Sequence, residues 1–531
     1  MKLNNIDDRF STSDQLSVAD IPALAQDGVK LLICNRPDGE AAGQADFATI
    51  AGAAQRAGID AVHIPFVSGE LSPQHLDAFS RQLQRGMRTH AYCRTGRRSQ
   101  EIWRASRAAT PAVAHDGGRS SAENHYQIVI VGAGSAGIAV AASLLKRNAD
   151  LRIALVDPAE EHFYQPGWTL VGGGVFDVAG TRRDMAALIP EGTHWVRKAV
   201  AGFEPEHNRI RLDDDSVLYY SHLVVAAGIK LDWDAVEGLS ETLGSNGVCS
   251  NYRYDLAPYT WQLTQELSRG RALFTQPPQP IKCAGAPQKA LYLAADHWLR
   301  QGVLNNVDIH FYNAGAVLFG VPDYVPALAA YMGKYRANLH YGHRLTRIDG
   351  DSRTAWFACS DENGATHVIE ERFDMIHVCP PQCAPDFIRS STLADGAGWL
   401  DVDPVTLRHS RYPNIWGLGD CIGTSNAKTM AAARKQAPIV AHNICDVLAG
   451  RHASRGYDGY GACPLTVERG RIVLAEFGYD GKLCPSFPKW LNDGTQATRF
   501  AWQLKARILP PLYWHGMLKG REWLTACQSA G

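Results

Sequence analysis

The segment that most constrains the fold is a glycine-rich turn between an apolar strand and a helix. The apolar run QIVIV leads into GAGSAG (residues 132–137), a helical stretch follows, and a second apolar run, RIALV, ends at Asp157. In such a turn Gly132 permits the tight bend, Gly134 lets the backbone approach a pyrophosphate, and Gly137 lets helix and strand pack closely. The helix N-terminus attracts the phosphates, and the acid at the end of the second strand can bind a ribose hydroxyl. The complete pattern predicts a dinucleotide-binding βαβ unit.

Later segments favour FAD over NAD as the dinucleotide. HLVVAAG ends in a small-residue turn at Ala227 and Gly228, and NIWGLGD ends at Gly419 and Asp420. An acid in that position can hydrogen-bond the ribityl chain of a flavin, and the following helix can point its N-terminus at the ring. These three segments together resemble the flavoprotein superfamily with two dinucleotide-binding domains.

A second dinucleotide unit midway along the chain is incomplete. RALFTQPPQPIKCAGAPQKALYL contains a strand and a helix but lacks the glycine pattern, and Cys283 lies where a pyrophosphate would need a close backbone approach. The reductant is therefore expected not to be a nicotinamide.

Composition and charge narrow the class of protein further. The 531 residues are 45% hydrophobic and 20% charged, as in ordinary globular proteins, and the net charge of -1 gives no reason to expect nucleic acid as a partner. The first residues lack a secretory signal, and no stretch approaches the ~18 apolar residues of a membrane-spanning helix. A location in the cytoplasm, peripheral on the inner membrane, is expected. The twelve cysteines should then be mostly thiols, and their spacing suggests no metal site.

The alternation of apolar runs predicts an α/β chain in several parts. Residues 1–106 alternate strands with helices, and residues 107–124 are rich in Ala, Gly, Ser and Pro, as in a linker. Residues 125–495 are expected to form tandem Rossmann-type folds. Residues 496–531 are aromatic, apolar and basic with helical spacing on either side of Pro510 and Pro511, which predicts an amphipathic segment on a membrane surface. A helix pair that covers the core or a dimer interface is the alternative for that segment.

Residues 125 to about 523 resemble the sulfide:quinone oxidoreductases, in particular the subgroup that contains the mitochondrial enzyme. The resemblance lies in HFYQPGWTLVGGG, IKCAGAPQKALYL, GAVLFGVPDY, AGWLDVD, RYPNIWGLGDC, YDGYGACPLT and LPPLYWHGMLKG. It implies oxidation of sulfide with FAD, transfer of electrons to a quinone, and delivery of sulfane sulfur to glutathione, sulfite or another thiol. It leaves a homo-oligomer open. The expected cofactor-binding residues are Gly132, Gly134, Ala136, Gly137, Asp157, Gln165, Ala227, Gly228, Gly419, Asp420 and Lys428.

The resemblance also implies a redox-active disulfide between Cys283 and Cys463. Cys283 would be the thiolate near the flavin and Cys463 would carry the persulfide. Lys289 could favour a thiolate or attract hydrosulfide, and it could equally be a solvated surface lysine. The sequence departs from the two-cysteine pattern at Cys379 and Cys383, which leaves open which pair works, although both are expected to be buried thiols.

The N-terminal part carries its own candidate nucleophile in HAYCRTGRRSQ. Cys93 follows a strand and precedes a helix, so backbone amides, the helix N-terminus and Arg94 and Arg98 can bind an anion and favour a thiolate. A tyrosine phosphatase needs five residues between its Cys and Arg, but Arg98 follows after four and Ser99 takes that place. The loop resembles that of rhodanese sulfurtransferases, and the whole unit resembles a phosphatase-like family found beside sulfur-oxidation enzymes.

Several alternative functions remain open at this point. The N-terminal unit is expected to transfer sulfur, with a protein phosphatase or an inactive module as alternatives. For the larger part the alternatives are a flavocytochrome-type sulfide dehydrogenase, an NADH:quinone oxidoreductase and a redox sensor without turnover. The lack of a C-x-x-C-H haem motif and of the second glycine pattern disfavours the first two.

Overall fold

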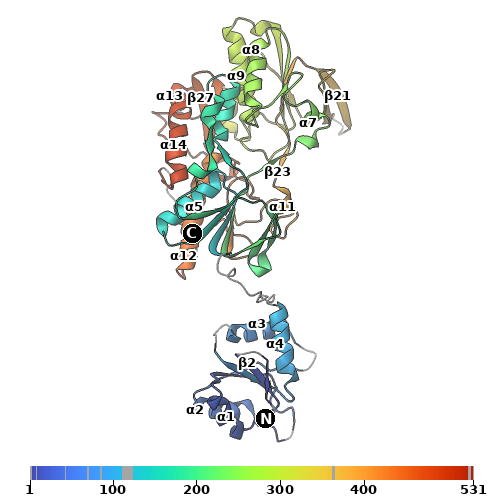
Figure 1. Cartoon of the computed structure of the whole chain (residues 1–531). Coiled ribbons are helices and arrows are strands. Elements are labelled where there is room, and N and C mark those ends of the chain that lie inside the picture. The colour runs from blue at the N-terminus through green and yellow to red at the C-terminus, as the bar shows by residue number, and fades with distance from the viewer. Residues whose placement is uncertain are drawn as a thin grey trace. The chain divides into compact units, whose positions relative to one another are not determined.

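The structure is a computed structural model that describes residues 3–6, 9–41, 43–67, 71–83, 87–109, 124–360, 365–523, 525 and 528–529. The chain separates into two compact units, residues 1–119 and 120–531, and each is described by itself (Figure 1). The predicted linker lies largely outside the described residues, so the proposed boundaries at 106, 124 and 495 stay predictions. The expected α/β fold class is confirmed in both units.

The N-terminal unit is a five-stranded sheet with helices packed against it. Its strands follow the order β1 (Asn4–Asn5), β2 (Phe10–Ser13), β5 (Thr89–Tyr92), β3 (Leu31–Cys34) and β4 (Asp60–His63), and every neighbour is parallel except β1. The helices are α1 (Ile21–Gln26), α2 (Phe47–Arg56), α3 (Pro73–Leu83) and α4 (Arg97–Ala109). The sequence pattern predicted β3–β5 and α2–α4. It missed β2 and α1, because FSTS and IPALAQ are too short to show a period.

The first sheet of the larger unit contains the glycine-rich turn. Its strands follow the order β10 (Thr193–Val196), β7 (Ile153–Val156), β6 (His125–Val131), β13 (Val217–Val225), β12 (Arg209–Leu212) and β11 (Val200–Glu204), and β24 (Ile415–Gly417) also pairs with β13. Strands β10, β7, β6, β13 and β24 are parallel, so their carboxyl ends meet at one edge. Helices α5 (Ser135–Arg147) and α12 (Met430–Leu448) pack along each other beside this sheet (Figure 1).

The second sheet is the counterpart without the glycine pattern. Its parallel strands are β15 (Val248–Cys249), β22 (Met375–His377), β16 (Gly270–Gln276), β17 (Val307–Asn313) and β18 (Asn338–Tyr341), in that order. It is accompanied by α8 (Ala257–Glu266), α9 (Ala286–Arg300) and α10 (Val325–Lys334), and by an antiparallel meander of β19 (Arg344–Asp349), β20 (Thr354–Ser360) and β21 (Thr366–Arg372). The two-dinucleotide-domain architecture is therefore confirmed.

A small antiparallel sheet and the C-terminal helices complete the larger unit. They comprise β26 (Gly461–Glu468), β27 (Arg471–Phe477), β28 (Ala497–Thr498), α13 (Arg499–Gln503), a π-helical turn (Leu504–Ile508) and α14 (Leu509–His515). The short elements are β8 (Glu161–Phe163), β9 (Arg182–Asp184), β14 (Lys230–Leu231), β23 (Gln382–Cys383), β25 (Arg455–Gly456), β29 (Gln528–Ser529), α6 (Trp168–Gly172), α7 (Leu239–Thr242) and α11 (Asp386–Arg389). No helix in the described part of the chain is long and apolar enough to cross a membrane.

The C-terminal segment differs from its prediction in two ways. Pro510 and Pro511 do not separate two helices: they occupy the first turn of α14, where a missing N–H costs little. Tyr513 and Trp514, two aromatic side chains of the segment predicted to lie on a membrane surface, are buried against the core of the first sheet. Covering that core removes more apolar aromatic surface from water than a place at the headgroups would.

Candidate active site

Two cysteines from distant parts of the chain meet beside the end of β16. Cys283 lies in the loop between β16 and α9, Cys463 lies on β26, and their Sγ atoms are 3.2 Å apart although 180 positions separate them. Cys283 has a left-handed backbone, with φ of 51°, and its N–H donates to the Lys428 carbonyl over 2.9 Å. A non-glycine residue in this region is uncommon and is held there by its surroundings. The loop is thus fixed to the segment before α12, which also bounds the dinucleotide edge.

The surroundings of the pair shift the pKa values of its two thiols in opposite directions. Lys289 Nζ donates to Cys283 Sγ over 3.0 Å. The hydrogen bond with Cys463 and the positive charges of Lys289 and Lys505 lower the pKa of Cys283 well below its ordinary value. The hydrogen bond with Cys283 and burial raise the pKa of Cys463 well above its ordinary value. Cys283 is therefore the sulfur that carries the negative charge in the reduced pair.

Lys505 was not predicted as a site residue. Its side chain is buried, its Nζ donates to the Pro166 carbonyl over 2.8 Å, and burial and the neighbouring Lys289 lower its pKa to about 7. The π-helical turn brings it to the cysteines from the C-terminal segment. The one signal for it is a lysine inside the apolar run WQLKARILPP, but that run was interpreted as part of a membrane-surface segment.

Lys282, directly before Cys283, is a third lysine beside the pair. Its Nζ donates to Gln165 Oε1 over 2.7 Å and lies 5.6 and 5.7 Å from the ring centroids of Trp168 and Tyr252. Loss of hydration lowers its pKa to about 8. Gln165, predicted to bind the cofactor, is thus placed near the cysteine pair.

The glycine-rich turn has the shape that a pyrophosphate needs. A Cβ on Gly137 would lie 1.8 Å from the Gly132 carbonyl oxygen, and a Cβ on Gly132 would lie 2.6 Å from the Ala226 carbonyl oxygen. A Cβ on Gly134 would meet nothing within 4 Å, so the backbone is open there. The first helical bond of α5 is from Ile138 N to Gly134 O, so the amides before it have no helical partner. The residues present therefore fit a bound dinucleotide.

The two predicted acids, Asp157 and Asp420, follow β7 and β24 at this edge. Asp157 accepts from Ala133 N over 2.6 Å and from Ala159 N over 2.9 Å. Asp420 is half-buried, and burial raises its pKa. Lys428 Nζ donates to the carbonyls of Asp420 and Ile422, at 2.8 Å each. Lys428 therefore orders the loop after β24, and a direct contact between Lys428 and the cofactor stays a prediction.

Three further predicted cofactor residues lie around the same edge. Gly228 and Gly419 have left-handed backbones, with φ of 72° and 80°. A Cβ on Gly419 would lie 3.2 Å from the Cβ of Ala136 in the first turn of α5. The segments after β13 and β24 thus approach the glycine-rich turn, as the parallel strands require, and Ala227 lies in the first of them.

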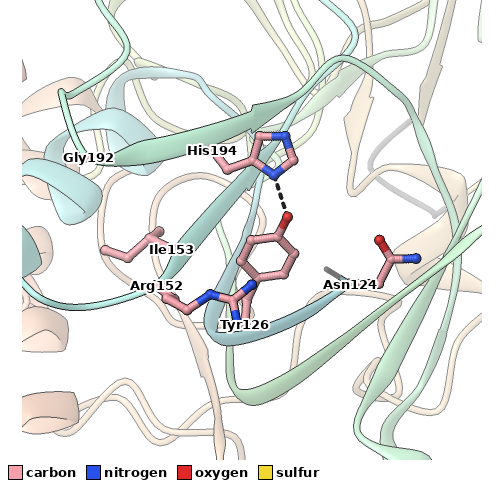
Figure 2. A pocket seen from close by; sticks show the side chains of 6 residues that line it. All are labelled: Asn124, Tyr126, Arg152, Ile153, Gly192 and His194. Carbon is pink, nitrogen blue, oxygen red and sulfur yellow. Dashed lines mark hydrogen bonds between the residues drawn. The ribbon is translucent and has the colours of Figure 1, made fainter. Parts of the chain in front are cut away.

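A separate hollow of about 470 Å³ lies at the opposite edge of the first sheet (Figure 2). It is lined by Asn124, Tyr126, Arg152, Ile153, Gly192 and His194, which stand at the starts of β6, β7 and β10. The Tyr126 hydroxyl hydrogen-bonds with His194 Nδ1, and the Arg152 guanidinium lies over the Tyr126 ring. None of the predicted site residues lines this hollow, so it is separate from the cysteine pair and the glycine-rich turn.

The Cys93 loop in the N-terminal unit runs from β5 into α4. Cys93 is 1% exposed, and its N–H donates to the Ser13 carbonyl. Gly96 has φ of 81°, and a Cβ there would lie 3.2 Å from the Ser13 carbonyl oxygen, so the loop packs on the end of β2. The Arg94 side chain is exposed, whereas Arg98 is buried and both of its Nη groups donate to Glu40. Arg94 and Arg98 were predicted to act together, but the structure separates their environments.

Comparisons with known proteins decide the family of the larger unit. The chain is 38% identical to the mitochondrial sulfide:quinone oxidoreductase of Mus musculus over 412 residues, 78% of this chain and 90% of that protein. It is 40% identical to the mitochondrial sulfide:quinone oxidoreductase of Dictyostelium discoideum over 404 residues, 75% of this chain and 87% of that protein. This chain belongs to the sulfide:quinone oxidoreductase family. The expected resemblance is confirmed.

The fold of this sulfide:quinone oxidoreductase family member agrees with a solved structure. The X-ray structure of the sulfide:quinone oxidoreductase from Aquifex aeolicus matches with a TM-score of 0.63 at 17% identity, over 77% of this chain and 97% of that one. Residues 2–110 match the family described as "Beta-lactamase hydrolase-like protein, phosphatase-like domain". The N-terminal unit is therefore the expected phosphatase-like domain.

The extra cysteines of this sulfide:quinone oxidoreductase family member lie in different surroundings. Cys379 is 2% exposed, and burial raises its pKa to about 12. Cys383 is half-buried on β23, and Arg389 Nη1 lies 3.6 Å from its Sγ. Buried-thiol roles for both stay a prediction.

Proposed function

We propose that residues 125–531 oxidise sulfide with FAD and a Cys283–Cys463 disulfide, and pass the electrons to a quinone and the sulfane sulfur to an acceptor. One observation carries this proposal: two sulfurs lie 3.2 Å apart, with a lysine ammonium 3.0 Å from one of them, and Cys283 N–H donates to Lys428, whose Nζ donates to the Asp420 carbonyl after β24. A disulfide bond needs an S–S distance of about 2.05 Å, which a small side-chain movement supplies. Family membership supports the same reaction.

The proposed reaction begins with the disulfide. A hydrosulfide ion attacks the Cys463 sulfur, the S–S bond breaks, and the products are the persulfide Cys463–S–SH and the thiolate Cys283–S⁻. The negative charge moves from hydrosulfide to Cys283, where Lys289 is placed to hold it. An acceptor thiolate then takes the outer sulfur and leaves Cys463 as a thiolate.

The two cysteines return to the disulfide when they lose two electrons. FAD, when bound, accepts this electron pair and passes it on to a quinone. The residues that would hold FAD are those around Gly134, Asp157 and Asp420. The chain's own contribution is to orient Cys283 and to keep positive groups, Lys289 and Lys505, around the thiolate.

The N-terminal unit is proposed to transfer sulfane sulfur through Cys93. Its support is the position of Cys93 between β5 and the N-terminus of α4, and the four-residue spacing to Arg98, which is one residue too short for a tyrosine phosphatase. A transient Cys93 persulfide would let this unit pass on the sulfur that the larger unit releases.

The quinone substrate implies that the protein works at a membrane surface. Three exposed apolar side chains support this part of the proposal: Trp490 is 85% exposed, Ile508 is 52% exposed and Leu491 is 42% exposed. Trp490 and Leu491 belong to a loop whose Phe487 packs against α13, the helix that precedes Ile508. An exposed tryptophan beside an apolar residue is typical of an interfacial anchor.

Anaerobic titration of the purified protein with sulfide tests the redox proposal. We expect a yellow protein whose flavin absorbance is bleached by sulfide and not by NADH. Cys283→Ser and Cys463→Ser should each lower sulfide-dependent quinone reduction at least about 100-fold with FAD retained, because a disulfide needs both sulfurs. Cys379→Ser and Cys383→Ser are the matched controls and should keep turnover within about twofold.

Two results would contradict the redox proposal. If the Cys283 or the Cys463 variant keeps wild-type turnover, this pair is not the working disulfide and Cys379 or Cys383 takes its place. If NADH bleaches the flavin as fast as sulfide does, the reaction is that of an NADH:quinone oxidoreductase.

A further inference from the structure

Two buried arginines beside the Cys93 loop share one carboxylate. Arg36, after β3, is 4% exposed, and Arg98, in the first turn of α4, is 5% exposed. Arg36 Nε donates to Glu40 over 2.8 Å, and the two Nη groups of Arg98 donate to Glu40 over 2.8 and 2.7 Å. The Nη pair of Arg98 is one of the forks with which an arginine holds two oxygens of an oxyanion. In this structure both Nη groups of Arg98 are already hydrogen-bonded to the Glu40 carboxylate.

The remaining contacts hold the arginines in place. Arg98 Nη1 also donates to the Phe66 carbonyl over 2.9 Å, and Arg36 Nη1 donates to Gln15 Oε1 over 2.7 Å. The hydrogen bonds from Arg98 and then Arg36 lower the pKa of Glu40 to about 2, so Glu40 is ionised at neutral pH. The two buried arginines and the partly exposed Glu40 carboxylate therefore sum to a single net positive charge beside Cys93.

Solvent screens the other positive charges of this loop. The side chains of Arg94 and Arg97 are exposed, and an exposed charge acts weakly at a buried sulfur. Burial opposes the charge of Arg98, but its hydrogen bonds to Glu40 and the charges of Glu40 and Cys93 raise its pKa. Arg98 therefore interacts electrostatically with both Glu40 and Cys93.

Sulfur donors differ in the charge that this site must hold. A hydropersulfide reacts as Cys93–S⁻ + R–S–SH → Cys93–S–SH + R–S⁻: the outer sulfur bonds to Cys93, the S–S bond of the donor breaks, and a monoanionic thiolate leaves. Thiosulfate is a dianion, and its leaving group, sulfite, is a dianion as well. Phosphate esters at neutral pH carry the same double charge. Each dianion needs more positive charge beside Cys93 than the single net positive charge of Arg36, Arg98 and Glu40 supplies.

We propose that Glu40 sets the donor specificity of Cys93: it closes the fork of Arg98, so the site takes sulfane sulfur from persulfides of low charge and discriminates against thiosulfate and phosphate esters. This rests on the proposed sulfur transfer at Cys93 and narrows its substrate class.

Single-turnover labelling of the reduced, full-length protein tests the inference. The donors are 2-hydroxyethyl hydropersulfide and thiosulfate, and the readout is the rate at which the Cys93 peptide gains one sulfur, measured by mass spectrometry. In the wild type we expect the persulfide to react at least about tenfold faster than thiosulfate. Glu40→Gln should shift the ratio of the two rates at least about tenfold toward thiosulfate, because it removes one negative charge beside the arginines.

Asp27→Asn is the matched control. Asp27 accepts from Arg88 over 2.7 Å at an exposed position of the same unit, so this variant removes one carboxylate and one ion pair away from Cys93. It should leave the ratio of rates unchanged. Inorganic phosphate should slow labelling of Glu40→Gln at lower concentrations than it slows the wild type.

The outcomes separate the inference from the function on which it rests. If Cys93 gains sulfur equally fast from both donors in the wild type, the inference is wrong whether or not Glu40→Gln folds. If Glu40→Gln folds and leaves the ratio unchanged, Glu40 does not set specificity, although sulfur transfer stands. If neither donor adds sulfur to Cys93, the proposed sulfur transfer itself is refuted.

Discussion

At the scale of single residues, Lys505 makes the reactivity of Cys283 depend on pH. Its pKa of about 7 means that Lys505 is charged below that pH and neutral above it. Its charge lowers the pKa of Cys283, so this support is present at low pH and is lost as the pH rises through about 7. We predict that Lys505→Met slows alkylation of Cys283 by iodoacetamide about three- to tenfold below neutral pH. Above it the two pH profiles should converge.

The measurement uses reduced protein and peptide mass spectrometry across a pH series. Lys489→Met is the control, because the Lys489 side chain is 83% exposed and its charge is screened. An equal slowing at every pH would show that Lys505 acts through packing rather than through its charge.

At the scale of elements, the C-terminal helices and the loop before them differ in where their aromatic side chains lie. Tyr513 and Trp514 of α14 cover the core, whereas Trp490 and Leu491 face solvent. We predict that Trp490→Ser combined with Leu491→Ser lowers the fraction bound to phosphatidylcholine–phosphatidylglycerol vesicles at least about fivefold, because it removes apolar surface from the interface. Co-sedimentation measures this fraction.

Val368→Ser is the control for membrane binding. Val368 on β21 is 59% exposed, so the change removes a similar kind of surface from another part of the unit. Equal loss of binding in the control and in the double variant would refute a specific anchor at Trp490 and Leu491.

At the scale of the whole molecule, the two compact units should work as separable catalysts. Cys93 lies in the first unit, and the Cys283–Cys463 pair lies in the second. We predict that Cys93→Ser keeps sulfide-dependent quinone reduction within about twofold and abolishes sulfane-sulfur transfer to cyanide at the N-terminal unit. Stopped-flow spectroscopy measures the first activity, and thiocyanate formation from a persulfide measures the second.

The same variant also tests the alternative function of the N-terminal unit. If the wild type hydrolyses an aryl phosphate efficiently, and Cys93 never carries extra sulfur after sulfide and quinone are supplied together, the unit is a phosphatase. A large loss of quinone reduction in Cys93→Ser would instead show that the two units are catalytically coupled.

Much of the fold and part of the candidate site could be predicted from local sequence patterns. The glycines of the dinucleotide turn, the strand–helix alternation and the loop position of Cys93 depend on neighbours within a few residues, and the structure has the corresponding elements. Family resemblance paired Cys283 with Cys463, whose sulfurs lie within contact distance. Elements of only a few residues, such as β2, carried too little periodicity to be recognised.

The sequence by itself determined which stretches are strands, helices and phosphate-binding turns, because those depend on backbone sterics and on the period of apolar side chains. Only the tertiary structure decided which charges meet. Lys505 reaches Cys283 from the C-terminal helices, and Glu40 closes on Arg98 across 58 positions. A lysine or glutamate in a polar stretch looks the same whether it is solvated or buried, and its burial and partners arise only when distant segments pack together.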